Sequence, residues 1–103
     1  MRVTFQQTIN DEDQGSVTLG EIEFLPLPGR PDLLSIEEYA LQCVDGSSLV
    51  VSAAYSPLNY NFSMFIKFEG KHVFTGMCHW DVVAPYFAFR LKDGSLVECY
   101  FAK

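Results

Sequence analysis

The chain has 103 residues, the size of one domain, so we expect residues 1–103 to fold as a single unit. Seven basic against thirteen acidic residues give a net charge of −6, the wrong sign for a protein that neutralises nucleic-acid phosphates. Apolar residues make up 49% of the chain, which is enough to build a core and argues against disorder. No apolar run approaches the roughly 18 residues of a spanning helix or resembles a secretory signal, so we expect no membrane contact and no export.

The cysteines bear on the cellular compartment. The chain has three cysteines, Cys43, Cys78 and Cys99, and no C-x-x-C motif. Because three is an odd number, they cannot all pair in disulfides within the chain. Free thiols are typical of reducing compartments. We therefore predict a cytoplasmic protein.

The first part of the chain predicts two strands. Apolar and polar residues alternate over residues 2–9 and again over residues 16–24, and the acidic segment 10–15 has the composition of a turn. The apolar phase of the second strand shifts by one residue across Gly20, which predicts a β-bulge at that glycine. The bulge places the apolar side chains on one face and directs two acidic ones to the other, Glu21 and Glu23.

The next segment is harder to assign. Three prolines make residues 25–31 a connector, because proline fits neither a central strand nor a helix interior. Ser35 and Glu38 have the spacing of a capping box, and positions 36, 39, 40, 43 and 44 would line one helical face. Alternation over residues 39–43 fits a strand instead. We favour a helical turn over residues 32–38 followed by a hairpin.

The last hairpin is predicted in more detail. A two-residue Asp-Gly loop would place Phe89 opposite Glu98. A three-residue loop over residues 92–94, with Gly94 in the left-handed conformation, instead pairs apolar residues with apolar residues across the hairpin. That loop gathers one apolar face: Phe87, Phe89, Leu91, Val97, Cys99 and Phe101. The same reasoning applies to residues 44–46, 48 positions earlier, and we interpret the likeness as two independent uses of a common turn.

Two further strands complete the predicted fold. Residues 60–68 alternate, residues 69–70 form a turn, and residues 71–79 return as a strand. The fold class is therefore mainly β with one short helical turn, built from about eight antiparallel strands. The pattern does not separate a small barrel from a strongly bent sheet or sandwich.

Candidate catalytic groups are few. Cys78 and His79 are neighbours on a predicted strand and point to opposite faces, so the imidazole cannot activate the thiol. His79 and Asp81 share a phase, and surface positions are the favoured interpretation for both. The other histidine, His72, has the opposite phase, so a metal site lacks converging ligands. We predict no catalytic residue, no metal and no cofactor.

Tyrosine and tryptophan side chains pack in cores and also form protein contacts. Tyr86 and Tyr100 face away from the apolar side of the last hairpin. They form either an exposed contact patch or, under another layer, a second core, and the second core is the favoured interpretation.

Charge is unevenly distributed along the chain. Residues 1–52 contain nine acidic and two basic residues, a balance of −7, whereas residues 53–103 contain four acidic and five basic residues, a balance of +1. Solubility alone explains any single carboxylate. A cluster on the first hairpin and beyond it would attract a basic protein surface. The candidate partner-binding residues are Asp11, Glu12, Asp13, Glu21, Glu23, Glu37 and Glu38.

These observations favour a small acidic inhibitor, an immunity-type antagonist that covers a basic functional site on a toxin, nuclease or other effector protein. No direct contact with nucleic acid or membrane is expected. One alternative is a small-molecule-binding β-barrel or enzyme with an aromatic-lined pocket. Another is a structural subunit joined to an assembly through a strand edge.

Overall fold

The computed structural model describes residues 1–9 and 15–103, and no helix occurs among them. The mainly β prediction is confirmed, with nine strands in these two ranges in place of about eight. The strands are β1 (Arg2–Thr8), β2 (Val17–Glu23), β3 (Leu25–Leu27), β4 (Arg30–Gln42), β5 (Ser48–Ser56), β6 (Asn61–Phe68), β7 (Lys71–His79), β8 (Tyr86–Arg90) and β9 (Leu96–Ala102). In this part of the chain nothing is helical, so no helix is long and apolar enough to cross a membrane.

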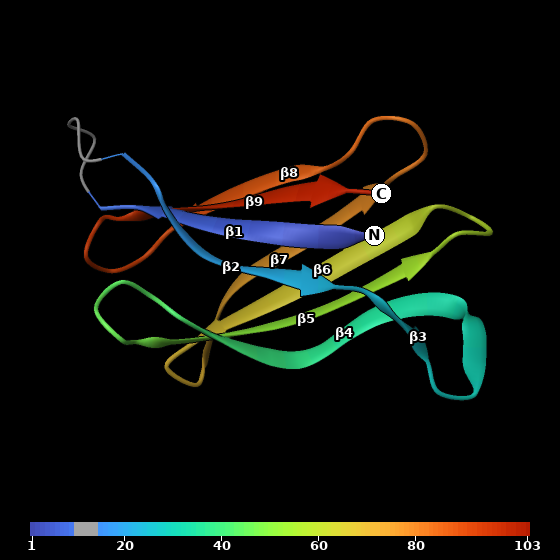
Figure 1. Ribbon diagram of the computed structural model, residues 1–103, viewed down its shortest axis with the longest axis horizontal. Coiled ribbons are helices and arrows are strands. Elements are labelled where there is room, and N and C mark those ends of the chain that lie inside the picture. Colours follow the sequence, from blue (N-terminus) through green and yellow to red (C-terminus); the bar gives the residue numbers. More distant parts are fainter. Residues whose placement is uncertain (10–14) are drawn as a thin grey trace.

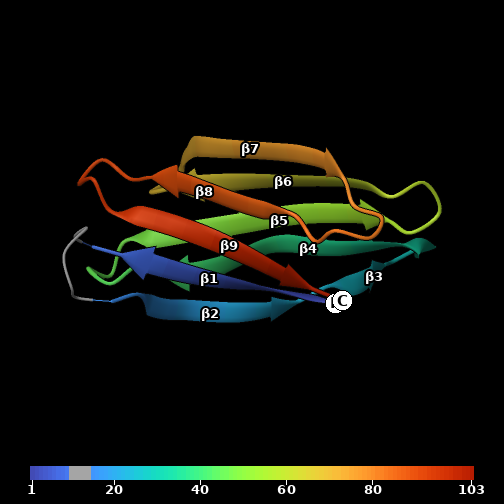
Figure 2. The same ribbon diagram turned by 90° about the horizontal axis from the view of Figure 1, so that it is seen from above.

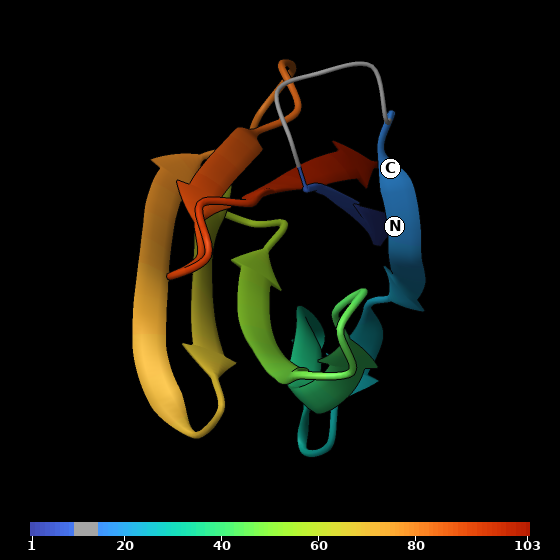
Figure 3. The same cartoon turned by 90° about the vertical axis from the view of Figure 1, so that its left-hand side faces the viewer.

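The strands form two antiparallel sheets (Figures 1 and 2). The four-stranded sheet has the order β2-β1-β9-β8, and the five-stranded sheet has the order β3-β4-β5-β6-β7. Within the described residues no strand ladder joins the two sheets, so they do not close into a barrel. Seen along the long axis, the sheets face each other, with β7 and β8 on one side and β2 on the other (Figure 3).

One core fills the space between the sheets. Phe62 of the five-stranded sheet packs edge-on against Phe101 of the four-stranded sheet, with ring centroids 4.9 Å apart. The ring centroids of Trp80 and Phe101 lie 5.7 Å apart. The Tyr55 hydroxyl donates a hydrogen bond to the backbone carbonyl of Trp80 at 2.7 Å. Tyr55, Phe62, Trp80 and Phe101 thus pack as core, whereas other rings of the later strands, such as Phe65, are exposed.

The last hairpin forms as predicted. Phe89 pairs with Val97, and Gly94 has a φ of 87°, so residues 92–94 are the three-residue loop. Leu91 donates to the carbonyl of Ser95. The equivalent loop at residues 44–46 has the same bonds, and its glycine has a φ of 89°.

A buried glutamine ties these two loops together. Gln7 in β1 points into the core and is 2% exposed. Its Nε2 donates to Ser95 Oγ at 3.0 Å, and its Oε1 accepts from the Val44 amide at 2.9 Å. One side chain therefore links the β8–β9 loop of one sheet to the β4–β5 loop of the other.

The aspartates of both loops make stability depend on pH. Asp93 accepts from the hydroxyl and amide of Ser95, which holds the pKa of its carboxyl below 3.8. Hydrogen bonds from Ser47 lower the pKa of Asp45 in the same way. A lowered pKa in the folded state stabilises the fold above the unfolded-state pKa, and this contribution disappears as the pH falls through the folded-state pKa.

We expect the urea concentration at the unfolding midpoint of the native protein to decrease as the pH is lowered from about 4 to about 2. The double substitution Asp45→Asn and Asp93→Asn keeps an acceptor oxygen in each loop but removes both titrations, so its midpoint should change less over that range. Urea denaturation, monitored by tryptophan fluorescence, measures the midpoints of the native protein and of the double variant. An identical pH dependence in the two proteins would show that these loops do not contribute.

The predicted helical turn over residues 32–38 is wrong, because β4 runs through this whole segment. Ile36 pairs with Ala53 and Tyr39 pairs with Val51, so two glutamates, Glu37 and Glu38, lie opposite one residue of β5. Because of this bulge, the buried side chains lie at even-numbered positions before it, such as Ile36, and at odd-numbered positions after it, such as Leu41. Apolar residues separated by such a shift have the three- and four-residue spacing of a helix, which accounts for the error.

The connector predicted over residues 25–31 is also only partly right. Leu25 to Leu27 form a short strand at the edge of the five-stranded sheet, where Pro26 is tolerated because an edge position does not require its missing N–H. Pro28 and Gly29 make the turn into β4. The prolines therefore marked an edge strand together with its turn.

The predicted bulge in β2 is confirmed. Phe5 pairs with Gly20 whereas Gln6 pairs with Thr18, so the register shifts at this glycine. Beyond the bulge, Ile22 is buried and faces the core. A Cβ on Gly20 would lie 2.6 Å from the Leu41 side chain, so the missing side chain lets β2 approach β4 of the other sheet.

Candidate functional site

A groove lies where β2 of the four-stranded sheet meets β3 and β4 of the five-stranded sheet. It has a volume of about 510 Å³. Three of its lining residues are carboxylates, Glu21, Glu23 and Glu37, and most of the others are apolar or aromatic: Ile22, Leu25, Pro26, Pro28, Ser35, Ile36 and Tyr39. We call this set of residues the acidic groove.

The four-stranded sheet supplies two of the carboxylates. Glu21 and Glu23 are exposed and flank buried Ile22, as strand alternation after the bulge requires. Both belong to the face turned away from the core, so their outward placement is confirmed. They reach the groove because β2 is the edge strand of its sheet.

The third carboxylate depends on the bulge in β4. Glu37 and Glu38 together oppose Ser52, and Glu38 takes a φ of 45°. Glu37 lines the acidic groove and also a neighbouring hollow on the five-stranded sheet, and Glu38 lines that second hollow. The bulge therefore leaves both adjacent glutamates exposed, one lining the groove and the other beside it.

The structure thus gathers three of the seven predicted partner-binding residues in one groove, and Glu38 lies beside it. The remaining three, Asp11, Glu12 and Asp13, fall outside the described residues. Sequence reasoning missed the apolar lining of the groove, especially the exposed Tyr39. The sequence feature that could have indicated this lining is the proline-rich segment, which supplies Leu25, Pro26 and Pro28.

Two carboxylates of the groove have cationic neighbours. Arg2 Nε lies 3.2 Å from Glu21 Oε1, and the N-terminal nitrogen lies 3.9 Å from Glu23 Oε2. The two glutamate side chains are 54% and 65% exposed. Exposed ion pairs contribute only about 0–1 kcal/mol, so a partner's cations can replace these neighbours at little cost. Glu37 has no ion-pair partner among the described residues.

Positive charge gathers at the opposite junction of the two sheets, between β7 and β8. A hollow of about 390 Å³ there is lined by Glu69 and three basic residues, Lys71, Arg90 and Lys92. Figure 3 shows β7 and β8 on the side of the molecule away from β2. Three carboxylates therefore line one junction and three basic side chains line the other, and we call these the acidic and the basic side of the molecule.

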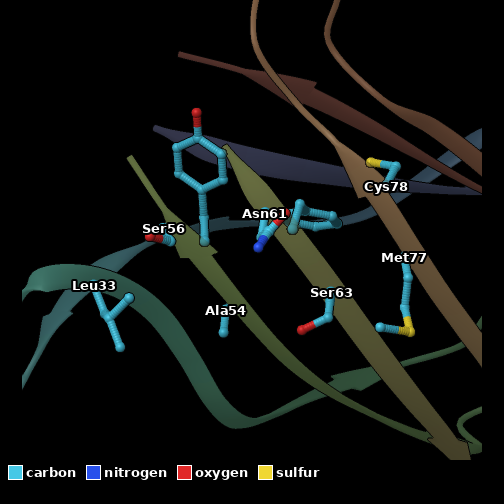
Figure 4. Close-up of a pocket in the computed structure, with 9 residues that line it drawn as sticks. Leu33, Ala54, Ser56, Asn61, Ser63, Met77 and Cys78 are labelled. Atoms are coloured by element: carbon cyan, nitrogen blue, oxygen red, sulfur yellow. The ribbon is translucent and has the colours of Figure 1, made fainter. Parts of the chain in front are cut away.

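A second large hollow lies on the five-stranded sheet and has a volume of about 560 Å³ (Figure 4). Its lining includes small or uncharged side chains, among them Ala54, Ser63 and Met77. Figure 4 shows that Cys78 points away from the side of the sheet on which Met77 lies. From the described part of the chain, no carboxylate, cation or histidine lines this hollow, and its two titratable lining residues are Tyr55 and Cys78.

The surroundings of two thiols and one histidine are defined by burial and by packing. Burial raises the pKa of Cys43 to about 11 and also raises that of Cys78, which keeps both thiols protonated at neutral pH. The His79 ring packs edge-on against Tyr60 with centroids 5.4 Å apart. In the described ranges no three His, Cys, Asp or Glu side chains lie close enough to hold a metal ion.

Comparison with family models, with curated proteins and with solved structures finds no match to this chain. The acidic groove therefore has to be interpreted from its own geometry. Its three carboxylates with an apolar lining suit contact with a surface that is both cationic and partly apolar.

Proposed function

We propose that this protein is an inhibitor of the immunity type, which covers a basic functional site on a partner protein such as a toxin or nuclease. The acidic groove is the observation that carries the proposal. A basic side chain of the partner enters between Glu21, Glu23 and Glu37, and the apolar lining, including Leu25 and Tyr39, excludes water around it. Substrate then cannot reach the covered site.

The distribution of charge supports this function. A net charge of −6 attracts a basic protein over a distance, and the basic hollow at the β7–β8 junction orients the molecule so that its acidic side approaches first. A rigid scaffold also lowers the entropic cost of association. For that scaffold we infer a two-sheet sandwich, which the shared core supports.

We place the protein in the cytoplasm. Three cysteines that form no disulfide support a reducing compartment. Because the partner in this proposal is basic, nucleic acid is a competitor for the partner's site and not a ligand of this chain.

Affinity capture from the source cell at low salt tests the proposal. The native protein should retain a basic protein that the triple variant Glu21→Lys, Glu23→Lys, Glu37→Lys does not retain, while circular dichroism shows both folded. The retained protein should lose its activity on adding native protein and keep it on adding the variant. Retention that is equal for both proteins, or retention without loss of activity, contradicts the proposal.

A further inference from the structure

A second polar cluster lies on the outer face of the four-stranded sheet, apart from the acidic groove. Tyr86 in β8 and Tyr100 in β9 are direct cross-strand partners. Both hydroxyls donate to Oε2 of Glu98, at 2.6 Å and 2.8 Å, and the two rings lie 5.4 Å apart at 48°. We call these three residues the tyrosine–glutamate cluster.

The cluster is open to solvent. Tyr86 is 53% exposed and Tyr100 is 42% exposed, so the favoured prediction of a second core over these tyrosines is wrong. No further layer covers them among the described residues, because the other sheet packs on the opposite, apolar face. Ala88 is the β8 partner of Glu98, and its small side chain leaves space beside the carboxylate.

The cluster carries one negative charge at neutral pH. The hydrogen bonds from Tyr86 and Tyr100 lower the pKa of Glu98, and the same bond raises the pKa of Tyr86 to about 12. The hydroxyls therefore stay protonated and continue to donate. Oε1 of Glu98 accepts no hydrogen bond within the described part of the chain, and none of the three ion pairs formed there includes this residue.

We propose that Tyr86, Glu98 and Tyr100 form a binding site for a guanidinium group, such as that of an arginine side chain exposed on another protein. Oε1 supplies an acceptor and the negative charge, and the ring faces attract a cation through their quadrupoles. A guanidinium is planar and weakly hydrated, so it stacks on a tyrosine and gives up little hydration. An ammonium group holds its water more strongly and binds such an open site less well.

This site goes beyond the acidic groove and does not depend on it. Tyr100 pairs with Thr4, and Thr4 pairs with Glu21, so the cluster and the groove lie two strand spacings apart, roughly 10 Å. A basic partner seated in the groove would therefore bring its neighbouring arginines to the cluster. The site is nevertheless testable with a free peptide, whatever the identity of that partner.

Nuclear magnetic resonance titration with the blocked peptide acetyl-Gly-Arg-Gly-amide tests the proposal. We expect saturable shifts of the Tyr86 and Tyr100 ring signals. The matched lysine peptide should bind about fivefold more weakly, and the peptide with neutral citrulline, which keeps the shape of arginine, should give no saturable shift. Equal shifts with citrulline, or none with arginine, would overturn the proposal.

Two variants locate the binding. Glu98→Gln keeps an acceptor for the tyrosine hydroxyls but removes the charge, and it should weaken the arginine peptide about fivefold or more. Glu21→Gln removes one charge from the acidic groove and should leave the affinity within twofold of the native value. The opposite pattern, with loss only in Glu21→Gln, would assign the peptide to the groove and exclude the cluster.

Discussion

Replacing Gln7 with leucine will lower the free energy of unfolding by about 2–3 kcal/mol. Leucine keeps most of the side-chain volume but can neither donate to Ser95 nor accept from the Val44 amide. A partly buried amide then loses its acceptor, and no side chain links the two loops. The effect is large because the bonds join the two sheets.

Urea denaturation of Gln7→Leu and of the matched variant Gln6→Leu measures this effect. Gln6 lies in the same strand but faces outward, so its replacement should change the free energy of unfolding by less than about 0.5 kcal/mol. Hydrogen exchange at Val44 should accelerate only in the first variant. Similar losses in both variants would mean that the bridge contributes nothing specific.

Replacing Glu37 with lysine will slow association with the basic partner about tenfold at low salt. This glutamate lines the groove without an ion-pair partner among the described residues, so its reversal leaves a cation where the partner's own cation should enter. The native rate should also fall steeply as salt rises, because a steered encounter is screened.

The control for this effect is Glu69→Lys, which changes the net charge by the same amount. Glu69 lies at the opposite junction, next to Lys71 and Lys92. Stopped-flow or surface-binding kinetics should place its association rate within about twofold of the native value. If both variants slow association equally, net charge and not the acidic groove governs the encounter.

Local chemistry in the sequence predicts some elements accurately. The Asp-Gly pair at residues 93–94 and the phase on either side of it select one loop length, because another would bury Glu98. Gly20 marks the β2 bulge because the apolar phase changes there. Each of these signals lies within a few residues of the element that it describes.

Elements that depend on distant residues are predicted less well. The β4 bulge at Glu37 and Glu38 forms against Ser52, and without that partner the segment has the spacing of a helix. Likewise, Glu21 and Glu37 can be selected as acidic, but their common groove requires β2 to meet β4 across two sheets. The bridge made by Gln7 was missed because its partners lie 37 and 88 residues away.

Hydrogen exchange of the complex shows whether a basic partner occupies the acidic groove. Amides of β2, β3 and the first half of β4 should gain protection on binding, because these strands surround the groove. Protection confined to β5, β6 and β7 would place the partner on the outer face of the five-stranded sheet and exclude the acidic groove as its binding site.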